Sequence, residues 1–291
     1  SHRACIHGVP EPAVTLLHLL RTPHTRMRLI HLTDPHLTSL DAWRPGVKSG
    51  KRWLSWLSWQ TRRRHLHRPA RLTALIAHLE TTRPDAWAIT GDLCQIGLEQ
   101  EAREAAAWLK QLAPANRVAL VPGNHDIFAR DSVDSIAQHW VKWLHVNPAA
   151  PEWPVVRTFD DVVLIGLNSA VVTPIAKATG KLGQTMRERL LRVLEESRGR
   201  CRVVLIHHPP LPGTCKPRKA LVDASELASV LRAQGPALVL HGHLHRNLAY
   251  GLNCGDGSET AVFCTASASA AGSQGAAAAR IFDISPVSDG Y

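Results

Sequence analysis

The amino-acid sequence predicts an α/β protein whose strands are mostly buried. Short apolar runs rich in β-branched residues alternate along the chain with segments of helical period. Such alternation is typical of sheets that are covered by helices. The apolar runs predict strands over 28–33, 86–90, 117–122, 162–168, 201–207 and 237–241.

The segments between these runs carry apolar residues at the spacing of one helix face. The pattern is clearest in Leu72, Leu75, Ile76 and Leu79. Equivalent spacing predicts further helices around 98–112, 190–194 and 227–231.

The C-terminal part of the chain has a different pattern. The segments 260–268 and 278–284 have strand character, and little helix follows them. A second sheet packed on the first would explain this. The Ala/Ser/Gly-rich segment 265–279 is either a flexible loop or a closely packed strand end.

The chain of 291 residues is long enough for one large domain. Residues 1–26 contain several prolines and precede Met27, which stands directly before the first predicted strand. We therefore expect a leader or a non-native addition over 1–26 and a single domain over 27–291.

Two features of the sequence bear on the cellular location of the protein. No apolar run reaches the length of a membrane-spanning helix, and no signal peptide is recognisable. The six cysteines form no Cys-x-x-Cys pair, which indicates reduced thiols rather than a disulfide framework. We expect a cytoplasmic protein, with peripheral attachment to a membrane as the alternative.

Five of the predicted strands end in polar residues that would be poor choices for a protein core. In open α/β sheets, ligand sites lie beyond the carboxyl ends of the strands. We therefore expect these side chains to converge on one site. The motifs are Asp34-Pro35-His36, Gly91-Asp92, Gly123-Asn124-His125-Asp126, His207-His208-Pro209-Pro210 and His241-Gly242-His243-Leu244-His245.

Several carboxylates that lie close together repel one another unless a cation compensates their charge. Mixed oxygen and imidazole ligands suit Mn, Fe, Zn or Co, and the lack of thiolates argues against a structural zinc site. Two such ions that share a carboxylate are the usual arrangement for in-line attack on phosphorus. The motifs therefore predict two divalent metal ions and a phosphoester substrate.

The ordered set D-P-H, G-D, G-N-H-D, H-H-P-P and G-H-L-H spans about 28–245 and resembles the calcineurin-like metallophosphoesterases. All five blocks stand in the family's order, whereas a lone G-D or G-N-H would be a weak signal. The resemblance implies a four-layer α/β/β/α sandwich of two mixed sheets flanked by helices. It also implies hydrolysis by a hydroxide that bridges two metals.

The resemblance also implies a role for each residue that matches a motif. Asp92 would bridge both metals in catalysis. His125 would contact the substrate phosphate, with Asn124 beside it, and could protonate the leaving group. His208 would line the pocket. The further metal ligands would be Asp34, His36 and His245 at the first metal, and Asn124, His207 and His243 at the second.

Position 95 departs from the family pattern. Many relatives carry an acidic residue three positions after the bridging Asp, where it pairs with the His of G-N-H, but this chain has Gln95. An amide can orient the imidazole of His125 but cannot stabilise its cation as a carboxylate would. We therefore expect a substrate whose leaving group needs little protonation, such as a nucleotide phosphate.

Between His36 and Asp92 the chain is longer than a strand–helix–strand connection requires, and the excess forms an insertion at about 41–68. The net charge of +10 comes largely from this region, because 42–79 contains no acidic residue. The charge is therefore not spread evenly, as in a general nucleic-acid binder. The insertion also carries the tryptophans Trp43, Trp53, Trp56 and Trp59.

Three interpretations of the insertion compete. It could be a cap whose tryptophans pack on the main domain while its arginines are solvated. It could bind an anionic membrane surface through residues 43–68, with Trp53, Trp56, Leu57 and Gln60 on one face of a short helix. A nucleic-acid platform, where aromatic rings stack on bases, is the third and less favoured interpretation.

We expect a dinuclear metal-dependent phosphoester hydrolase of phosphodiesterase type. The chain is similar to the branch of small bacterial phosphodiesterases. It is also similar to the branch that hydrolyses the pyrophosphate of UDP-2,3-diacylglucosamine in lipid A synthesis, which is the alternative. A non-catalytic protein that binds a membrane or nucleic acid is a remote alternative. Substrate choice would depend on the insertion and on the 208–220 loop, which adds Lys216, Arg218 and Lys219.

Overall fold

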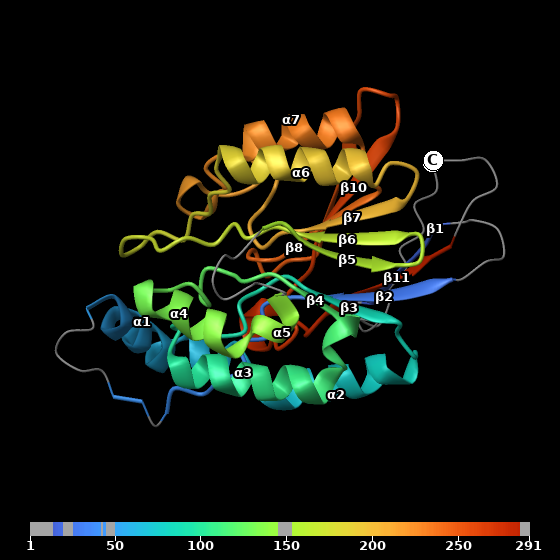
Figure 1. Ribbon diagram of the computed structural model, residues 1–291. Helices are drawn as coiled ribbons and strands as arrows, with labels where there is room; N and C mark the ends of the chain where they lie inside the picture. Colours follow the sequence, from blue (N-terminus) through green and yellow to red (C-terminus); the bar gives the residue numbers. More distant parts are fainter. Residues whose placement is uncertain (1–13, 20–25, 42, 45–49, 145–152, 286–291) are drawn as a thin grey trace, which may run out of the picture.

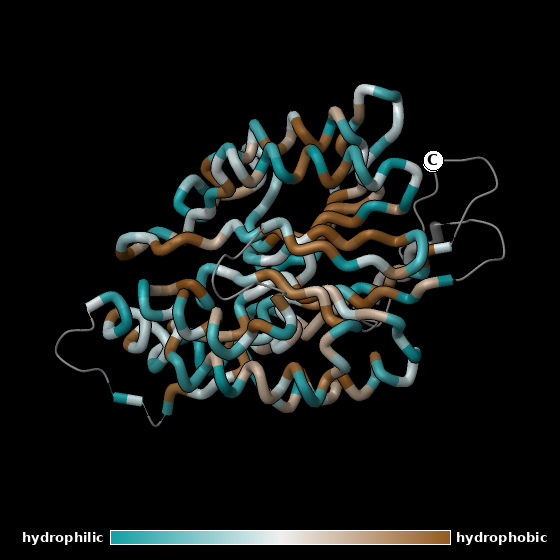
Figure 2. The backbone as a smooth tube through the Cα atoms, viewed as in Figure 1, coloured by the Kyte–Doolittle hydropathy of each residue, from teal (hydrophilic) through white to brown (hydrophobic). Residues whose placement is uncertain are grey.

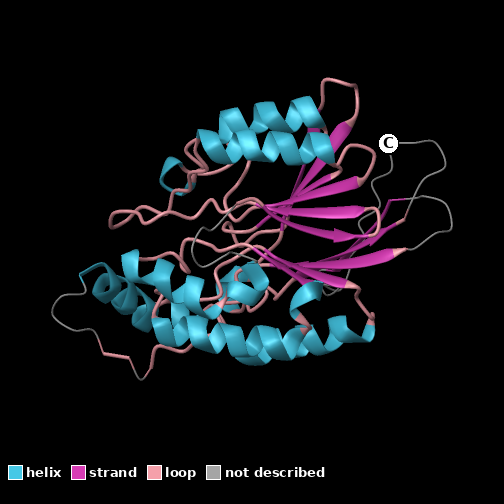
Figure 3. Cartoon of the chain, viewed as in Figure 1, coloured by secondary structure: helices cyan, strands magenta, loops and turns pink. Residues whose placement is uncertain are grey.

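The computed structural model describes residues 14–19, 26–41, 43–44, 50–144 and 153–285. Two sheets lie face to face, and helices cover the outer face of each (Figure 1). Figure 3 shows the same four layers by element type, with both sheets between the helical layers. The predicted α/β/β/α sandwich of two mixed sheets is therefore confirmed.

The first sheet consists of β1 (Val14–Leu19), β2 (Met27–Leu32), β3 (Ala86–Ile89), β4 (Val118–Leu120) and β11 (Ala279–Ile284). Its strand order is β1-β11-β2-β3-β4. Strands β2, β3 and β4 run parallel, whereas β11 is antiparallel to β2. Although β1 adds an edge strand from within 1–26, the origin of that segment stays a prediction.

The second sheet consists of β5 (Val155–Phe159), β6 (Val162–Gly166), β7 (Cys201–Leu205), β8 (Leu238–His241), β9 (Leu248–Asn253) and β10 (Glu259–Cys264). Its strand order is β5-β6-β7-β8-β10-β9. The four central strands are parallel, and the two edge strands are antiparallel to their neighbours. All eight predicted strand regions are strands in the structure, whereas β1, β5 and β9 were not predicted.

The outer layers are formed by helices of 4 to 14 residues. Helices α6 (Gln184–Glu196) and α7 (Ala224–Gln234) cover the second sheet (Figure 1). The first sheet is covered by α2 (Pro69–Thr81), α3 (Glu99–Leu112), α4 (Arg130–His139) and α5 (Val141–Leu144). Among the described residues, no helix combines the length and apolar character that crossing a bilayer requires.

Each central strand is buried on both faces. One face packs against the other sheet and the opposite face packs against helices. In β2, Leu29 belongs to the apolar cluster between the sheets, together with Val203 of β7 and Leu240 of β8. Its neighbour Ile30 belongs instead to the cluster shared with α2 and α3. Figure 2 accordingly shows hydrophobic residues concentrated in the strands at the centre of the molecule. Burial of both faces explains why these strands have nearly continuous apolar sequences.

The insertion contains the helix α1 (Gly50–Thr61), as predicted, but a different residue anchors it. Trp59 is buried against Leu40, Ile96 and Phe128, and Trp56 packs on the same cluster. Trp53 and Leu57, which the sequence placed on the apolar face, are instead exposed. The expected solvation of the insertion's arginines is also wrong in part, because Arg52 contacts the main domain.

Arg52 ties α1 to the loops that follow β3 and to α4. Its guanidinium donates to both carboxylate oxygens of Asp131 and to the carbonyl oxygens of Ile96 and Gly97. A bidentate pair of this kind adds orientation as well as energy. The insertion therefore lies as a defined element over the carboxyl ends of the first sheet.

Replacing Trp59 with Ala should lower the free energy of unfolding by about 3 kcal/mol, because it opens a cavity under α1. Replacing Trp53 with Ala should cost less than about 0.5 kcal/mol, since that side chain already meets solvent. Urea and thermal unfolding of both variants measure the difference. Equal losses would contradict this packing of α1.

Candidate metal centre

The carboxyl ends of strands from both sheets meet at one end of the sandwich. Asp34 follows β2, Asp92 follows β3, and the loop after β4 carries Asn124. From the second sheet, His207 follows β7 and His243 follows β8. Because these strands are parallel within each sheet, their ends bring the five residues to the same edge.

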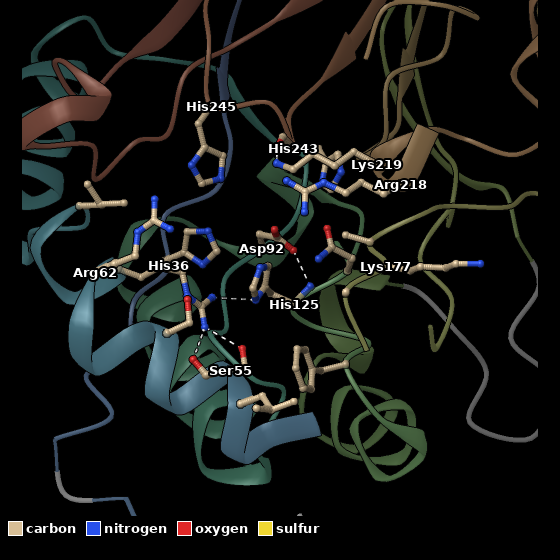
Figure 4. A pocket seen from close by; sticks show the side chains of 18 of the residues that line it. His36, Ser55, Arg62, Asp92, His125, Lys177, Arg218, Lys219, His243 and His245 are labelled. Carbon is tan, nitrogen blue, oxygen red and sulfur yellow. Dashed lines mark hydrogen bonds between the residues drawn. The ribbon is translucent and has the colours of Figure 1, made fainter. Parts of the chain in front are cut away.

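The ligand atoms of the residues predicted from the sequence form two groups, and a third group joins His67 to His36 and His245. Those of Asp34, His36, Asp92 and His245 lie within 4.8 Å of one another, and those of Asp92, His207 and His243 form a second such group. Asp92 belongs to both. Asn124 joins the second group, since its Oδ1 lies 3.2 Å from Nε2 of His207. The structure thus brings together all seven residues that the sequence proposed as ligands; Figure 4 shows His36, Asp92, His243 and His245 around the same cavity.

The residues that carry these side chains have an unusual backbone conformation. Only eight non-glycine residues in the described chain have positive φ angles. L-residues adopt this conformation at a cost of about 1–3 kcal/mol, and such residues cluster at functional sites. Five of the eight are proposed metal ligands: Asp34, His36, Asp92, His243 and His245.

Two glycines allow the loops to approach closely. A Cβ atom on Gly123 would clash with the carboxylate of Asp92, and one on Gly242 would clash with the hydroxyl of Thr33. The loops also bond directly, because the Asp34 N–H donates to the Gly91 carbonyl over 2.9 Å. The motif glycines therefore serve packing of the loops rather than flexibility.

Hydrogen bonds orient the imidazoles toward the centre. Nδ1 of His36 donates to the Cys94 carbonyl over 2.9 Å, and Nδ1 of His207 donates to the Thr90 carbonyl over 2.6 Å. Nδ1 of His245 lies 3.0 Å from Oε1 of Gln274. In each ring the remaining Nε2 is then the atom that can bind a metal.

The charges at the site are balanced by imidazoles. Nε2 of His245 lies 3.1 Å from the Asp34 carboxylate, and Nε2 of His207 lies 3.4 Å from the Asp92 carboxylate. Burial opposes protonation of His207, but Asp92 outweighs it and raises the pKa of His207 to about 9. Nε2 of His243 is buried without a hydrogen-bond partner among the described residues. A divalent cation would satisfy both carboxylates and this nitrogen, so the donor set fits a metal.

The structure corrects the expected role of Gln95. Nδ1 of His125 donates over 2.5 Å to the backbone carbonyl of Gln95, while the Gln95 side chain turns away and donates to the His36 carbonyl. Burial lowers the pKa of His125 to about 4, so this imidazole is neutral at pH 7. The side-chain amide therefore does not orient His125; the main chain does.

His208 lies deeper than expected. Its ring is fully buried, 4.7 Å from the ring of His243, and Nδ1 lies 2.8 Å from the Ser169 hydroxyl. The side chains that line the described cavity include Asn124 and His125 but not His208. The expectation that His208 lines the pocket is therefore wrong. Of the basic residues in the 208–220 loop, Arg218 and Lys219 line the cavity and Lys216 does not.

The segment 265–279 is closely packed at its start rather than flexible. Residues 266–271 are buried, and the Ser267 hydroxyl donates to the Asp34 carbonyl over 2.6 Å. The Ala268 N–H donates to the Thr33 carbonyl over 2.9 Å. Small side chains are needed here because this segment supports the loop that carries Asp34.

A family model described as calcineurin-like phosphoesterase matches residues 27–247 of the chain. The match covers more than half of the chain and includes all five motifs. The chain belongs to the calcineurin-like phosphoesterase family. Its described residues include a candidate His/Asp metal site at these motifs.

A curated relative of this phosphoesterase comes from Rhodococcus erythropolis and is named a probable cyclic nucleotide phosphodiesterase. The two are 27% identical over 231 residues. The match covers 77% of this chain and 66% of the relative, so the chain spans slightly less than two thirds of the relative's length.

Solved structures of similar fold include a dimetal phosphatase from Danio rerio, with a TM-score of 0.55 and 14% identity. That match covers 84% of this chain and 89% of the other. A purple acid phosphatase from yellow lupin (Lupinus luteus) seeds has a TM-score of 0.52 and 12% identity, covering 84% of this chain and 45% of the other. At this level of identity the similarity supports the fold alone.

Three residues at the phosphoesterase site were not predicted from the sequence. Asp126 accepts hydrogen bonds from the backbone N–H groups of Asp92, Cys94 and Gly123 over 2.8–2.9 Å. Its place in the G-N-H-D motif could have identified it. The ring of His67 lies tilted against that of His36, with 4.3 Å between ring centroids, and Arg63 contacts His125. Both stand in the basic insertion, where no local signal distinguishes them.

Replacing Asp126 with Ala should weaken folding and metal binding together. The change leaves three buried N–H groups without an acceptor, at about 1–3 kcal/mol each. Asp126→Asn keeps one amide oxygen as an acceptor and should therefore lose less stability and less metal affinity. Thermal unfolding and calorimetric titration with Mn²⁺ measure the two effects. Weaker metal binding at unchanged stability would contradict a clamping role for Asp126.

Proposed function

We propose that this phosphoesterase holds two divalent metal ions and hydrolyses phosphodiester bonds. The first ion would be bound by Asp34, His36 and His245, the second by Asn124, His207 and His243, with Asp92 shared by both. The observation that carries the proposal is the membership of Asp92 in both ligand groups. Mn, Fe, Zn and Co all accept such nitrogen and oxygen ligands.

Two ions held by these residues would supply an activated water molecule and would neutralise charge on the phosphoryl oxygens. The protein itself contributes by positioning the side chains around the substrate phosphate. The Asp92 carboxylate accepts the His125 backbone N–H over 2.7 Å, which couples the bridging residue to the G-N-H loop. His125 then presents Nε2 beside Asn124 at the cavity, where both can contact the substrate phosphate.

His125 would be a weak general acid, because it is neutral at pH 7 and only a main-chain carbonyl supports its Nδ1. A good leaving group needs little protonation in the transition state. This favours esters of nucleotides or aryl alcohols over esters of simple alkyl alcohols. The name of the Rhodococcus relative points in the same direction.

The cavity supports an anionic substrate. It has a volume of about 650 Å³, and six Lys or Arg residues line it beside a single carboxylate, Asp92. The cations stand on two walls: Lys51, Arg62 and Arg63 come from the insertion, and Lys177, Arg218 and Lys219 lie across the cavity. Such a field concentrates phosphate esters at the site.

One observation favours a second candidate, a lipid-linked pyrophosphatase that acts at a membrane surface. Trp53, Leu54 and Leu57 of α1 are 42–45% exposed, and Leu54 also lines the cavity. Apolar side chains beside Lys51 and Arg62 suit an interface with anionic lipid. The substrate would then enter from the membrane side of α1.

Asp92→Asn should reduce turnover of bis(p-nitrophenyl) phosphate by about 10³-fold or more, because it weakens both metal sites at once. The matched control is Asp134→Asn, an exposed carboxylate on α4, which should retain full activity. Metal content by mass spectrometry should fall only in the first variant. Full activity of the wild type after exhaustive chelation would rule out the proposed mechanism.

Changing Trp53, Leu54 and Leu57 together to Ser should reduce co-sedimentation with phosphatidylglycerol vesicles. Val133→Ser, which changes an equally exposed side chain on α4, is the control. Vesicles of phosphatidylcholine alone should bind neither form strongly, since the basic residues need anionic lipid. Equal pelleting of the triple variant and the wild type would remove α1 from the membrane hypothesis.

A further inference from the structure

Arg63 of the insertion reaches the centre of the catalytic cavity. It lies at the start of a short 3-10 helix, Arg63–His65, directly after α1. Its side chain lines the cavity together with Asp92 and His125, and its Nε is fully buried. The family motifs do not include this position, since it stands outside all five blocks.

One end of the Arg63 guanidinium is hydrogen-bonded to the protein, whereas the other end lacks an acceptor among the described residues. Nη2 donates to the carbonyl and to the hydroxyl of Ser55, over 2.8 and 2.7 Å (Figure 4). Nε has no hydrogen-bond partner among the described residues. Nη1 lies 3.5 Å from Nδ1 of His125, but that nitrogen donates its own proton to Gln95, so two donors face each other. Nη1 therefore retains free N–H donors, whereas the buried Nε is out of reach of a molecule in the cavity.

The charge of Arg63 also lacks a direct counter-ion. Among the described residues it forms no ion pair, although Asp92 and Glu101 act on it through space. Arg52 of α1 provides the contrast, because its guanidinium is saturated by Asp131 and two carbonyls. Partial burial of a cation whose N–H donors are unpaired costs free energy unless an anion binds to those donors.

We propose that Arg63 is a further catalytic residue, which binds a non-bridging oxygen of the substrate phosphoryl group through Nη1. The inference rests on the proposed phosphodiesterase function and deepens it. A charged guanidinium N–H forms a strong hydrogen bond to a phosphate oxygen. The same contact strengthens as negative charge accumulates on those oxygens in the transition state.

This role gives the insertion a chemical function. Trp59 and Arg52 anchor α1 to the main domain, and Ser55 then fixes the guanidinium from the same helix. Arg63 approaches His125 at Nδ1, the nitrogen that also donates to the backbone carbonyl of Gln95. The insertion thus adds a cation to the substrate phosphate without altering the strand-end ligands.

The test compares Arg63→Ala with Arg64→Ala, in which the neighbouring exposed arginine is removed as a matched control. For Arg63→Ala, kcat/KM on bis(p-nitrophenyl) phosphate should fall by about 10²-fold. Inhibition by inorganic phosphate should weaken by roughly tenfold, because a charged hydrogen bond to the anion is lost. Arg64→Ala should stay within about twofold of wild type in both measurements.

Added guanidinium chloride at low concentration should restore part of the activity of Arg63→Ala, since the free cation can enter the vacated space. Arg63→Lys keeps the charge but not the fork, and should lie between the two. Metal content and melting temperature of each variant separate this role from a structural one. Unchanged kcat/KM and phosphate inhibition in a folded, metal-loaded Arg63→Ala would overturn the proposal.

The two proposals fail differently. If wild type hydrolyses no phosphodiester, the proposed function is wrong, whereas phosphate binding measured by calorimetry would still test Arg63. If wild type is active and Arg63→Ala binds phosphate equally well, the inference about Arg63 is wrong and the function stands. If Arg63→Ala folds poorly, Arg63→Lys provides the test, and wild-type kinetics of that variant would overturn a role for the guanidinium.

Discussion

The carboxylate of Asp92 is the point at which the two sheets of the sandwich meet chemically. One oxygen accepts the His125 N–H from the loop after β4, and the other faces His207 at the end of β7. The residue also takes part in both groups of ligand atoms. Any displacement of this one side chain therefore changes both halves of the site, so its position has to be set by backbone rather than by side-chain packing.

That position depends on strained turns and on the close contact of neighbouring loops. Asp92 has a φ of 57°, and its N–H donates to the buried Asp126, which also holds Gly123. Burial raises the pKa of Asp126 to about 7, which shows how little solvent reaches this clamp. Rigid main chain is what a metal centre needs, because ligands must stay in place before the ions bind.

The insertion has both a structural and a chemical character. Trp56, Trp59 and Arg52 attach it to the main domain, whereas Arg63 and His67 line the catalytic cavity. A family with fixed ligands on strand ends can in this way vary its substrate through a peripheral element. The exposed apolar residues of α1 add a third surface, at the mouth of the same cavity.

The sequence by itself predicted the layers, and it predicted the candidate ligands that the structure brings together. Buried strands carry continuous apolar runs and strand-end turns carry their own polar residues, so both signals are local. Tertiary structure alone decided the edge strands β5 and β9, whose half-exposed faces give no such run. It also decided that the main chain of Gln95 orients His125, that His208 lies behind His243, and that Arg63 rather than Arg64 enters the cavity. Each of these depends on partners distant in the chain, which no local pattern records.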